Sequence, residues 1–163
     1  MAVEFAKLGC KLSLSDIRME LLEETKAVVM KRAKVTEDKI AIFLCDVSDR
    51  QQVAEGAAIA RKAHGPVHIL VNNAGIVSGK KILDNPEAMM KKTLDVNTLA
   101  HLYTIKEFMP DMIKENKGHI ISIASMAATS AIAAMADYCA SKSGAFAIDE
   151  AVRMEIKKQG YNI

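Results

Sequence analysis

The sequence lacks any long run of apolar residues. No stretch approaches the roughly 18–20 apolar residues that a membrane-spanning helix needs, and the residues after Met1 form no signal-peptide pattern. We therefore predict no membrane span within these 163 residues. Half of the residues are hydrophobic, which is enough to form the core of one three-layer α/β domain.

The chain also lacks a strong charge of either sign. Its 22 Lys and Arg residues stand against 20 Asp and Glu residues, so the formal net charge at pH 7 is only +2. The basic residues are spread over predicted helix faces, as at Lys31, Arg32 and Lys34, which is typical of a solvated surface. This balance argues against a nucleic-acid partner.

Cysteine is scarce, and no two cysteines form a C-x-x-C pair. The odd number and wide spacing predict buried free thiols in a reducing compartment for Cys10, Cys45 and Cys139. The one close histidine pair is His64 and His68, but Gly65-Pro66 breaks the helix between them. We therefore predict no metal site, and a structural role for His68 and for His119.

Apolar strands and amphipathic helices alternate along the whole sequence. Strands are predicted at residues 11–15, 40–45, 68–71 and 118–125. Helices are predicted at residues 18–33, 49–64 and 133–159, and a longer helical pattern runs from Asn85 as N-cap to Asn116, with breaks near Asn97 and at Pro110. A capping box at residues 48–51 is expected to begin the second helix. The alternation predicts right-handed βαβ units, as in a doubly wound parallel sheet.

Tyr138 and Lys142 carry the clearest chemical signal. Residues four apart share one face of a helix, and an ammonium beside a phenol favours the phenolate, which lets a tyrosine work as a general acid or base. Ser125, at the carboxyl end of the 118–125 strand, can hold the oxygen of an alcohol or ketone. Tyr and Lys four apart also occur by chance, so the pair alone favours a structural and a catalytic role about equally.

Further polar and small residues stand at the positions where a ligand is expected. Asn72-Asn73-Ala74-Gly75 directly follows the 68–71 strand, and its small and amide side chains permit close approach of a flat ligand. Asn97 lies inside the long helical pattern. Ligands of open α/β sheets bind at the carboxyl ends of the strands, where residues 72–75 and Ser125 are predicted to lie.

Taken together, Asn72-Asn73-Ala74-Gly75, Asn97, Ser125 and the Tyr138-x-x-x-Lys142 motif resemble the short-chain dehydrogenase/reductase family, and the resemblance covers essentially the whole chain. Residues 72–81 and 136–142 are most similar to the retinol dehydrogenase and 17-beta-hydroxysteroid dehydrogenase-like group. The resemblance implies a three-layer Rossmann-type fold. It also implies an oxidoreductase that transfers a hydride between NAD(P) and a lipid-like alcohol or ketone, such as a retinoid or steroid.

The same resemblance implies a role for each matching residue. Tyr138 would be the catalytic acid/base, Ser125 the partner of the substrate oxygen, Lys142 the ligand of the nicotinamide ribose, and Asn97 the holder of a water that links the site to solvent. The adenosine side of the cofactor would be lined by Asn73, Ala74 and Gly75, with Asp46 and Val47 against the adenine. Asp16 would bind the adenine ribose hydroxyls, which favours NAD over NADP.

The chain departs from the family pattern at both ends. Residues 1–9 resemble the end of the family's first helix with Gly9 as its C-terminal cap, so the first strand and its phosphate-binding glycine turn are expected to be missing. Residues 161–163 resemble the approach to a further strand. We therefore expect residues 1–163 to be one partial dinucleotide-binding domain, doubtful as an enzyme by itself. A naturally short protein is the alternative.

Partners and location follow from the same resemblance. It implies a homodimer through the two long helices that begin near Thr98 and Tyr138, and the second carries a small-residue surface of Ala140, Ser143, Gly144, Ala147 and Ala151. The alternative, that this surface packs against the chain's own sheet, is equally compatible with the sequence. An intracellular location is expected, cytoplasmic or at the endoplasmic reticulum or lipid droplets through a region outside this chain. One other function stays open, a catalytically silent chain that keeps the dimer surface. A flavodoxin-type binding module is disfavoured, because it gives no reason for the Asn, Ser, Tyr and Lys set.

Overall fold

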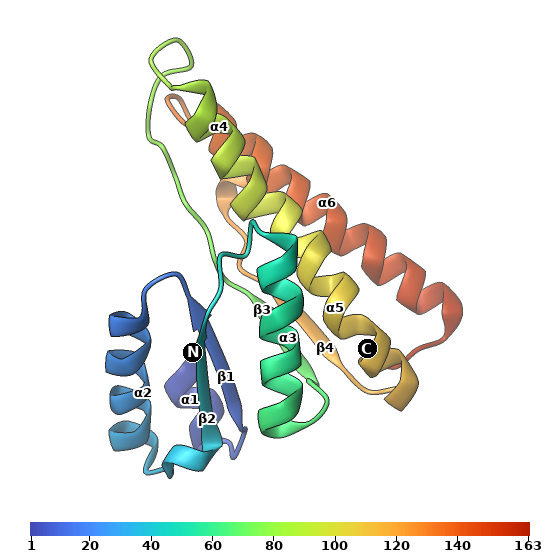
Figure 1. The fold of residues 1–163 in the computed structure, drawn as a ribbon. Coiled ribbons are helices and arrows are strands. Elements are labelled where there is room, and N and C mark those ends of the chain that lie inside the picture. The colour runs from blue at the N-terminus through green and yellow to red at the C-terminus, as the bar shows by residue number, and fades with distance from the viewer. The chain divides into compact units, whose positions relative to one another are not determined.

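The computed structural model describes residues 1–163, which form two compact units, Met1–Val67 and His68–Ile163 (Figure 1). Each unit contains one pair of parallel strands covered by helices. Parallel strands alternating with helices confirm the predicted α/β class. The prediction of a single partial domain stays a prediction. None of the helices is both long and apolar enough to cross a membrane.

The Met1–Val67 unit follows the predicted alternation closely. Its elements are α1 (Ala2–Lys7), β1 (Leu12–Asp16), α2 (Met19–Ala33), the 3₁₀ helix η1 (Glu37–Lys39), β2 (Ile40–Leu44) and α3 (Arg50–His64). β1 pairs with β2 in parallel, from Leu12 opposite Ile40 to Asp16 opposite Leu44. Gly9 follows α1 with a φ of 85°, a left-handed conformation that suits glycine at the end of a helix.

The alternation of side chains along β1 and β2 separates two packing faces. Leu12 and Ile40 form one core with Ala6 of α1 and Val29 of α2. The other face carries Phe43, which packs against α3 at Gly56, where a Cβ would lie 2.6 Å from the ring. The two strands therefore lie between α2 and α3, as Figure 1 shows, and the unit has three layers.

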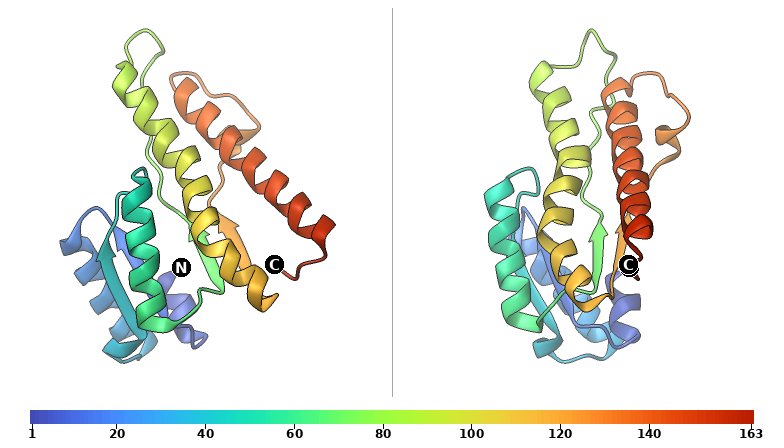
Figure 2. Two further views of the ribbon diagram at one scale, coloured as in Figure 1. Left: turned by 45° about the vertical axis from the view of Figure 1, so that its right-hand side comes forward. Right: turned by 90° about the vertical axis from the view of Figure 1, so that its right-hand side faces the viewer.

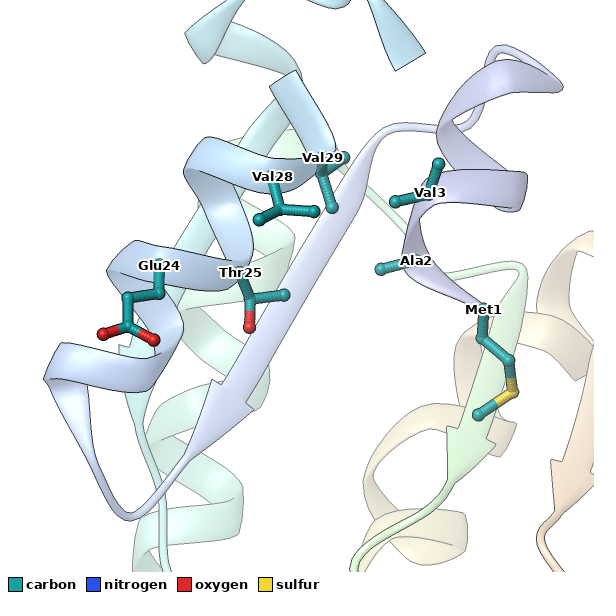
Figure 3. A pocket seen from close by; sticks show the side chains of 7 residues that line it. All are labelled: Met1, Ala2, Val3, Glu24, Thr25, Val28 and Val29. Atoms are coloured by element: carbon teal, nitrogen blue, oxygen red, sulfur yellow. The ribbon is translucent and has the colours of Figure 1, made fainter. Parts of the chain in front are cut away.

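An open depression separates α1 from the neighbouring part of α2 (Figure 3). Its lining consists mostly of small apolar side chains, among them Ala2, Val3, Val28 and Val29, with the Glu24 carboxylate at one side. None of the predicted site residues lines it.

The start of α3 differs from the predicted capping box. Asp49 rather than Ser48 is the N-cap, and its carboxylate accepts hydrogen bonds from the backbone N–H groups of Gln51 and Gln52. Ser48 instead donates its hydroxyl hydrogen to Asp46 at 2.6 Å. Because Asp is as good an N-cap as Ser, a shift of one residue keeps the helix and changes only its cap.

The free-thiol prediction holds, but only part of the burial prediction does. Cys10, Cys45 and Cys139 are all unpaired, yet only Cys45 is buried, whereas the other two are half-buried. Burial, with a smaller effect of the nearby Asp46 and Asp49 charges, raises the pKa of the Cys45 thiol.

The His68–Ile163 unit contains the remaining elements. They are β3 (Ile69–Asn72), α4 (Glu87–Leu94), the π-helical turn η2 (Asp95–Leu99), α5 (Ala100–Glu115), β4 (His119–Ser122), the 3₁₀ helix η3 (Met126–Ala128) and α6 (Ala136–Gln159). β3 and β4 pair in parallel. The helices α4 and α5 run on through η2 almost as one rod, and α6 lies alongside them (Figures 1 and 2).

The core of this unit lies between the strands and the two long helices. Leu70, Ile105 and Met112 are buried there, and Ile148 and Val152 of α6 pack against them. Gly118 permits this packing, because a Cβ at that position would lie 2.6 Å from the Met112 side chain. α5 and α6 are thereby fixed against β3 and β4.

Three details of this unit correct the sequence interpretation. Pro110 does not break the helix, because α5 continues through it to Glu115 with the proline on an exposed side. The N-cap of α4 is Pro86, whereas the buried side chain of Asn85 donates to Ser78. The last helix begins at Ala136, three residues later than predicted.

Candidate active site

The first turns of α6 place Tyr138 and Lys142 on one face, as their spacing predicts. The Lys142 Nζ lies 6.0 Å from the centroid of the Tyr138 ring. The Lys142 side chain is buried, at 5% exposure, and its ammonium donates a hydrogen bond of 2.8 Å to the carbonyl of Ile123 just after β4. The carbonyl holds the lysine in place and satisfies one of its three N–H groups, so two remain to bind a ligand.

Ser125 lies three residues beyond the end of β4, which is shorter than predicted. The backbone N–H of Ile123 still donates to the Asn72 carbonyl at 2.9 Å, so the chain stays extended beyond the strand. The Ser125 Oγ accepts a hydrogen bond of 3.1 Å from Ala127 and caps η3. Because the oxygen is the acceptor, its own hydrogen is available for a substrate oxygen.

Contacts between η3 and α6 join the two segments that carry these hydroxyl groups. η3 packs against α6, and the Ser143 hydroxyl donates to the Ala128 carbonyl at 2.7 Å. Ser125 is the N-cap of η3, and Tyr138 lies in the first turn of α6. The unit therefore holds two neutral hydroxyl groups and one ammonium on adjoining segments, a set that can bind an oxygen and transfer a proton.

Asn97 connects three parts of the site through its side chain. It is completely buried, and its Oδ1 accepts from the Ile76 N–H at 2.9 Å. Its Nδ2 donates to the Ile76 carbonyl at 2.8 Å and to the Ser141 Oγ at 2.9 Å. Both amide hydrogens are thus used within the protein. Asn97 lies in η2, a π-helical turn of the kind that often marks functional sites. Its predicted role in holding a water stays a prediction.

Ser141 is a site residue that the sequence interpretation did not include. It is fully buried, and its hydroxyl donates to the Tyr138 carbonyl at 2.7 Å while accepting from Asn97. The Thr98 hydroxyl donates to the Ser141 carbonyl at 2.8 Å. Ser141 therefore fixes the turn that carries Tyr138. The sequence feature that could have indicated Ser141 is its position between Tyr138 and Lys142, directly before the lysine.

Gly75 lies directly beside the lysine and the asparagine. A Cβ at Gly75 would lie 3.5 Å from the Asn97 Oδ1 and 3.6 Å from the Lys142 Nζ. Asn73 and Ala74 are exposed after β3, whereas Asn72 is buried and accepts from the Thr104 hydroxyl at 2.7 Å. Asn72 thus anchors the strand end, and residues 73–75 leave an open backbone surface.

The remaining predicted site residues belong to the Met1–Val67 unit. Asp16 is the last residue of β1, and its Oδ1 accepts from the Arg18 N–H at 3.0 Å. Asp46 follows β2, its Oδ1 accepts from the Ser48 N–H at 3.0 Å, and Val47 beside it is half-buried. Because β1 and β2 are parallel neighbours, these acids lie at the same edge of the pair.

Known proteins are similar to this chain over almost all of its residues. A family model described as short chain dehydrogenase matches residues 1–163. The chain is 44% identical to epidermal retinol dehydrogenase 2 of Homo sapiens over 161 residues, which are 98% of this chain and 51% of that protein. It is 39% identical to estradiol 17-beta-dehydrogenase 11 of Macaca fascicularis over 155 residues, which are 95% and 50% of the two chains. The chain thus spans about half the length of these relatives.

Solved structures with the same fold confirm the predicted fold class. A short chain dehydrogenase/reductase from Burkholderia phymatum in complex with NAD is 29% identical, with a TM-score of 0.91, covering 99% of this chain and 57% of that one. A metagenomic short-chain oxidoreductase in complex with NADP is also 29% identical, with a TM-score of 0.88, covering 96% and 70%. The two structures hold different forms of the nicotinamide cofactor.

Proposed function

The chain belongs to the short chain dehydrogenase family, and on that premise we propose that the whole protein is an NAD(P)-dependent oxidoreductase that interconverts an alcohol and a carbonyl compound. The observation that carries the proposal is the pairing of Tyr138 with the buried Lys142 on the first turns of α6. No other described part of the chain offers a phenol next to a buried ammonium.

In this proposal, three side chains of the His68–Ile163 unit act on the substrate oxygen. Tyr138 takes the hydroxyl proton of an alcohol during oxidation and returns it to a carbonyl oxygen during reduction. Ser125 donates its hydrogen to the same oxygen, and the Ile123 carbonyl holds the Lys142 ammonium beside the phenol. The bound nicotinamide supplies or accepts the hydride.

The residues present fit such a cofactor. The two remaining N–H groups of Lys142 suit the hydroxyls of a ribose, and the open backbone at residues 73–75 suits a flat ring or sugar. Asp16 suits the adenine ribose because its carboxylate is 43% exposed and can accept hydroxyl hydrogens. The same negative charge repels a 2′-phosphate, which is the basis for proposing NAD over NADP. Asp46 and Val47 are proposed to contact the adenine.

A lipid-like alcohol is the substrate class that the surface favours. Exposed apolar side chains follow residues of the site along the chain, with Met126 after Ser125 at 81% exposure and Val77 after Ile76, which Asn97 holds, at 51%. Ile132, which is 45% exposed, donates its backbone N–H to the Cys139 sulfur next to Tyr138. Exposed apolar side chains beside polar site residues suit a largely hydrocarbon substrate. The relatives named for retinol and estradiol direct the proposal to a retinoid or a steroid.

A homodimer through α5 and α6 is proposed as the assembly. Ala140, Ser143, Ala147 and Ala151 are exposed on α6, next to the exposed Phe146. Gly144 belongs to a different side, since a Cβ there would lie 2.8 Å from the Thr98 side chain of the same chain. The small-residue surface is therefore divided. Gly144 packs internally and the Ser143 hydroxyl is bonded to Ala128, whereas Ala140, Ala147 and Ala151 are available to a second copy. An intracellular location is proposed on the basis of the free cysteines.

Replacement of Tyr138 by phenylalanine tests the proposed function. In the whole protein, Tyr138→Phe is expected to lower kcat by about 10²–10⁴-fold, the usual contribution of a general acid or base, with the Kd for NAD nearly unchanged. Steady-state kinetics with retinol and a hydroxysteroid, together with titration of the cofactor, provide the measurement. Tyr103→Phe, which changes a half-buried tyrosine of α5, is the matched control. Near-normal turnover in Tyr138→Phe would contradict the proposal.

A further inference from the structure

Asp137 is a buried carboxylate directly before Tyr138 that the proposed proton transfer does not use. Its side chain is only 7% exposed. Both of its oxygens lie 3.0 Å from the Ser78 hydroxyl, which donates to them, and the Ser78 oxygen in turn accepts from the Asn85 Nδ2 at 3.0 Å. Thr93 of α4 and the Tyr138 backbone N–H also lower the pKa of this carboxyl. One acid therefore connects α6, α4 and the segment between β3 and α4.

These contacts keep Asp137 ionised. Burial raises the pKa of the carboxyl, but the hydrogen bonds from Thr93, Ser78 and Asn85 outweigh that effect, and the pKa lies below its usual range. The carboxylate also lies in the first turn of α6, where the positive end of the helix dipole stabilises a negative charge. An ionised, buried carboxylate without a role in proton transfer is a strong anchor for its hydrogen-bond donors.

The anchored segment, residues 73–86, is held from one side at two neighbouring positions. Asn97 holds the backbone of Ile76, and Asp137 holds the side chain of Ser78. Val77 between them is 51% exposed, as alternation in an extended chain requires. Both anchors also reach the turn of α6 that carries Tyr138, Asn97 through Ser141 and Asp137 as the adjacent residue.

We propose that Asp137 is a positioning residue that fixes Tyr138 by fastening residues 73–86 to the first turn of α6 through Ser78 and Asn85. The inference rests on the proposed function, since it assigns to Asp137 the placement of the acid/base. Loss of the connection leaves the phenol chemically intact but less well placed. A small misplacement of a reacting group lowers the rate of the chemical step more than it weakens binding of the cofactor.

Single and double substitutions in the whole protein test this role. Ser78→Ala and Asp137→Asn are each expected to lower kcat by about 10-fold to 100-fold, because small misplacements have effects of that size, while the KM for NAD changes by about twofold or less. Because both residues act through one connection, the double variant is expected to be no less active than the less active of the two single variants. Ser78→Thr keeps the hydroxyl and should restore most of the activity. Asp84→Asn, an exposed acid on the same segment, is the matched control.

The outcomes separate this inference from the proposed function. If the kcat values of Asp137→Asn and Ser78→Ala equal that of Asp84→Asn, the positioning role is overturned. It is also overturned if the fold-losses of kcat in the two single variants multiply in the double variant. If Asp137→Asn does not fold, as judged by its thermal melt, Ser78→Ala and Ser78→Thr decide the matter. If the unsubstituted protein has no dehydrogenase activity with retinoid or steroid alcohols, the proposed function fails first, whatever these variants do.

Discussion

Individual side chains of the site have little conformational freedom. Asn97 and Ser141 are completely buried, and each makes at least two hydrogen bonds that a substitution would leave unsatisfied. Lys142 is held by the Ile123 carbonyl. Such fixed groups favour catalysis because little reorganisation remains when a substrate binds. Tyr138 and Ser125, the residues proposed to contact the substrate, are half-buried and therefore accessible.

The charge of Asp16 predicts which cofactor the protein prefers. The unsubstituted protein should have a higher kcat/KM for NAD than for NADP, because a carboxylate and a phosphate charge repel each other by about 1 kcal/mol at 4 Å in water. Asp16→Asn should lower the ratio of kcat/KM for NAD to kcat/KM for NADP by about fivefold, because about 1 kcal/mol corresponds to that factor. Glu20→Gln, at an exposed acid in the first turn of α2, is the control.

Arg18 is the residue that opposes this expectation. Its Nε lies 3.8 Å from the Asp16 Oδ1, so its charge partly offsets the carboxylate in the present arrangement. A clear preference of the unsubstituted protein for NADP would show that Arg18 outweighs Asp16. In that case Arg18→Ala, rather than Asp16→Asn, would change the ratio of the two kcat/KM values.

Among the elements, α3 offers the sharpest stability test because its cap differs from the predicted one. Asp49→Ala should lower the Tm at neutral pH, since it removes the acceptor of the Gln51 and Gln52 backbone N–H groups. Ser48→Ala should lower the Tm less, because Ser48 lies outside the helix. Thermal melts of the two variants, recorded by circular dichroism, provide the measurement. A larger loss in Ser48→Ala would contradict the assigned cap.

The effect of Asp49 also has a predictable pH dependence. Hydrogen bonds from Gln52 and then Gln51 hold the pKa of the Asp49 carboxyl below its usual range. A carboxyl whose pKa is lower in the folded state stabilises the fold at pH values above its unfolded pKa of about 3.9, and the contribution disappears as the pH falls through the folded value. The Tm difference between Asp49→Ala and the unsubstituted protein should therefore shrink in acid below pH ~4.

Most elements were predictable because their patterns are local. The strands at β1 and β2 and the helix α2 agree with the sequence to within about a residue, since apolar periodicity decides them. Pro110 was misjudged because its cost depends on whether the helix side is exposed, which sequence does not reveal. Asn85 was assigned as a cap because of its residue type, whereas its amide serves Ser78 and, through it, Asp137.

The residues of the candidate site also fall into two groups, those that a local sequence pattern indicates and those that only tertiary contacts bring together. The motif positions Tyr138, Lys142, Ser125 and Asn97 could be proposed from the sequence because their residue types and spacing are distinctive. Ser141 and Asp137 were missed because serine and aspartate at a helix start are common, and their contacts join residues 44 and 59 positions apart. Such pairings depend on tertiary contacts that no local pattern encodes.

At the scale of the whole molecule, a substitution on α6 tests the proposed homodimer. Ala147→Arg places a large charged side chain on the exposed small-residue surface and should convert a dimer to a monomer, because a close helix contact cannot accommodate it. Sedimentation velocity or light scattering measures the change in mass. Ala58→Arg, at an exposed alanine of α3, is the matched control. An unchanged mass in Ala147→Arg would exclude this surface as the dimer contact.

Isotope transfer tests the proposed reaction, in which the alcohol gives a hydride to the cofactor while Tyr138 takes the hydroxyl proton. The whole protein is incubated with NAD and with a retinoid or steroid alcohol that carries deuterium on its carbinol carbon, and the reduced cofactor is analysed by mass spectrometry. Breaking the C–D bond should move the deuterium, with its electron pair, to the cofactor. We expect labelled NADH with the unsubstituted protein and only traces with Tyr138→Phe. Absence of label with both alcohols, or equal labelling by Tyr138→Phe, would contradict the proposed reaction.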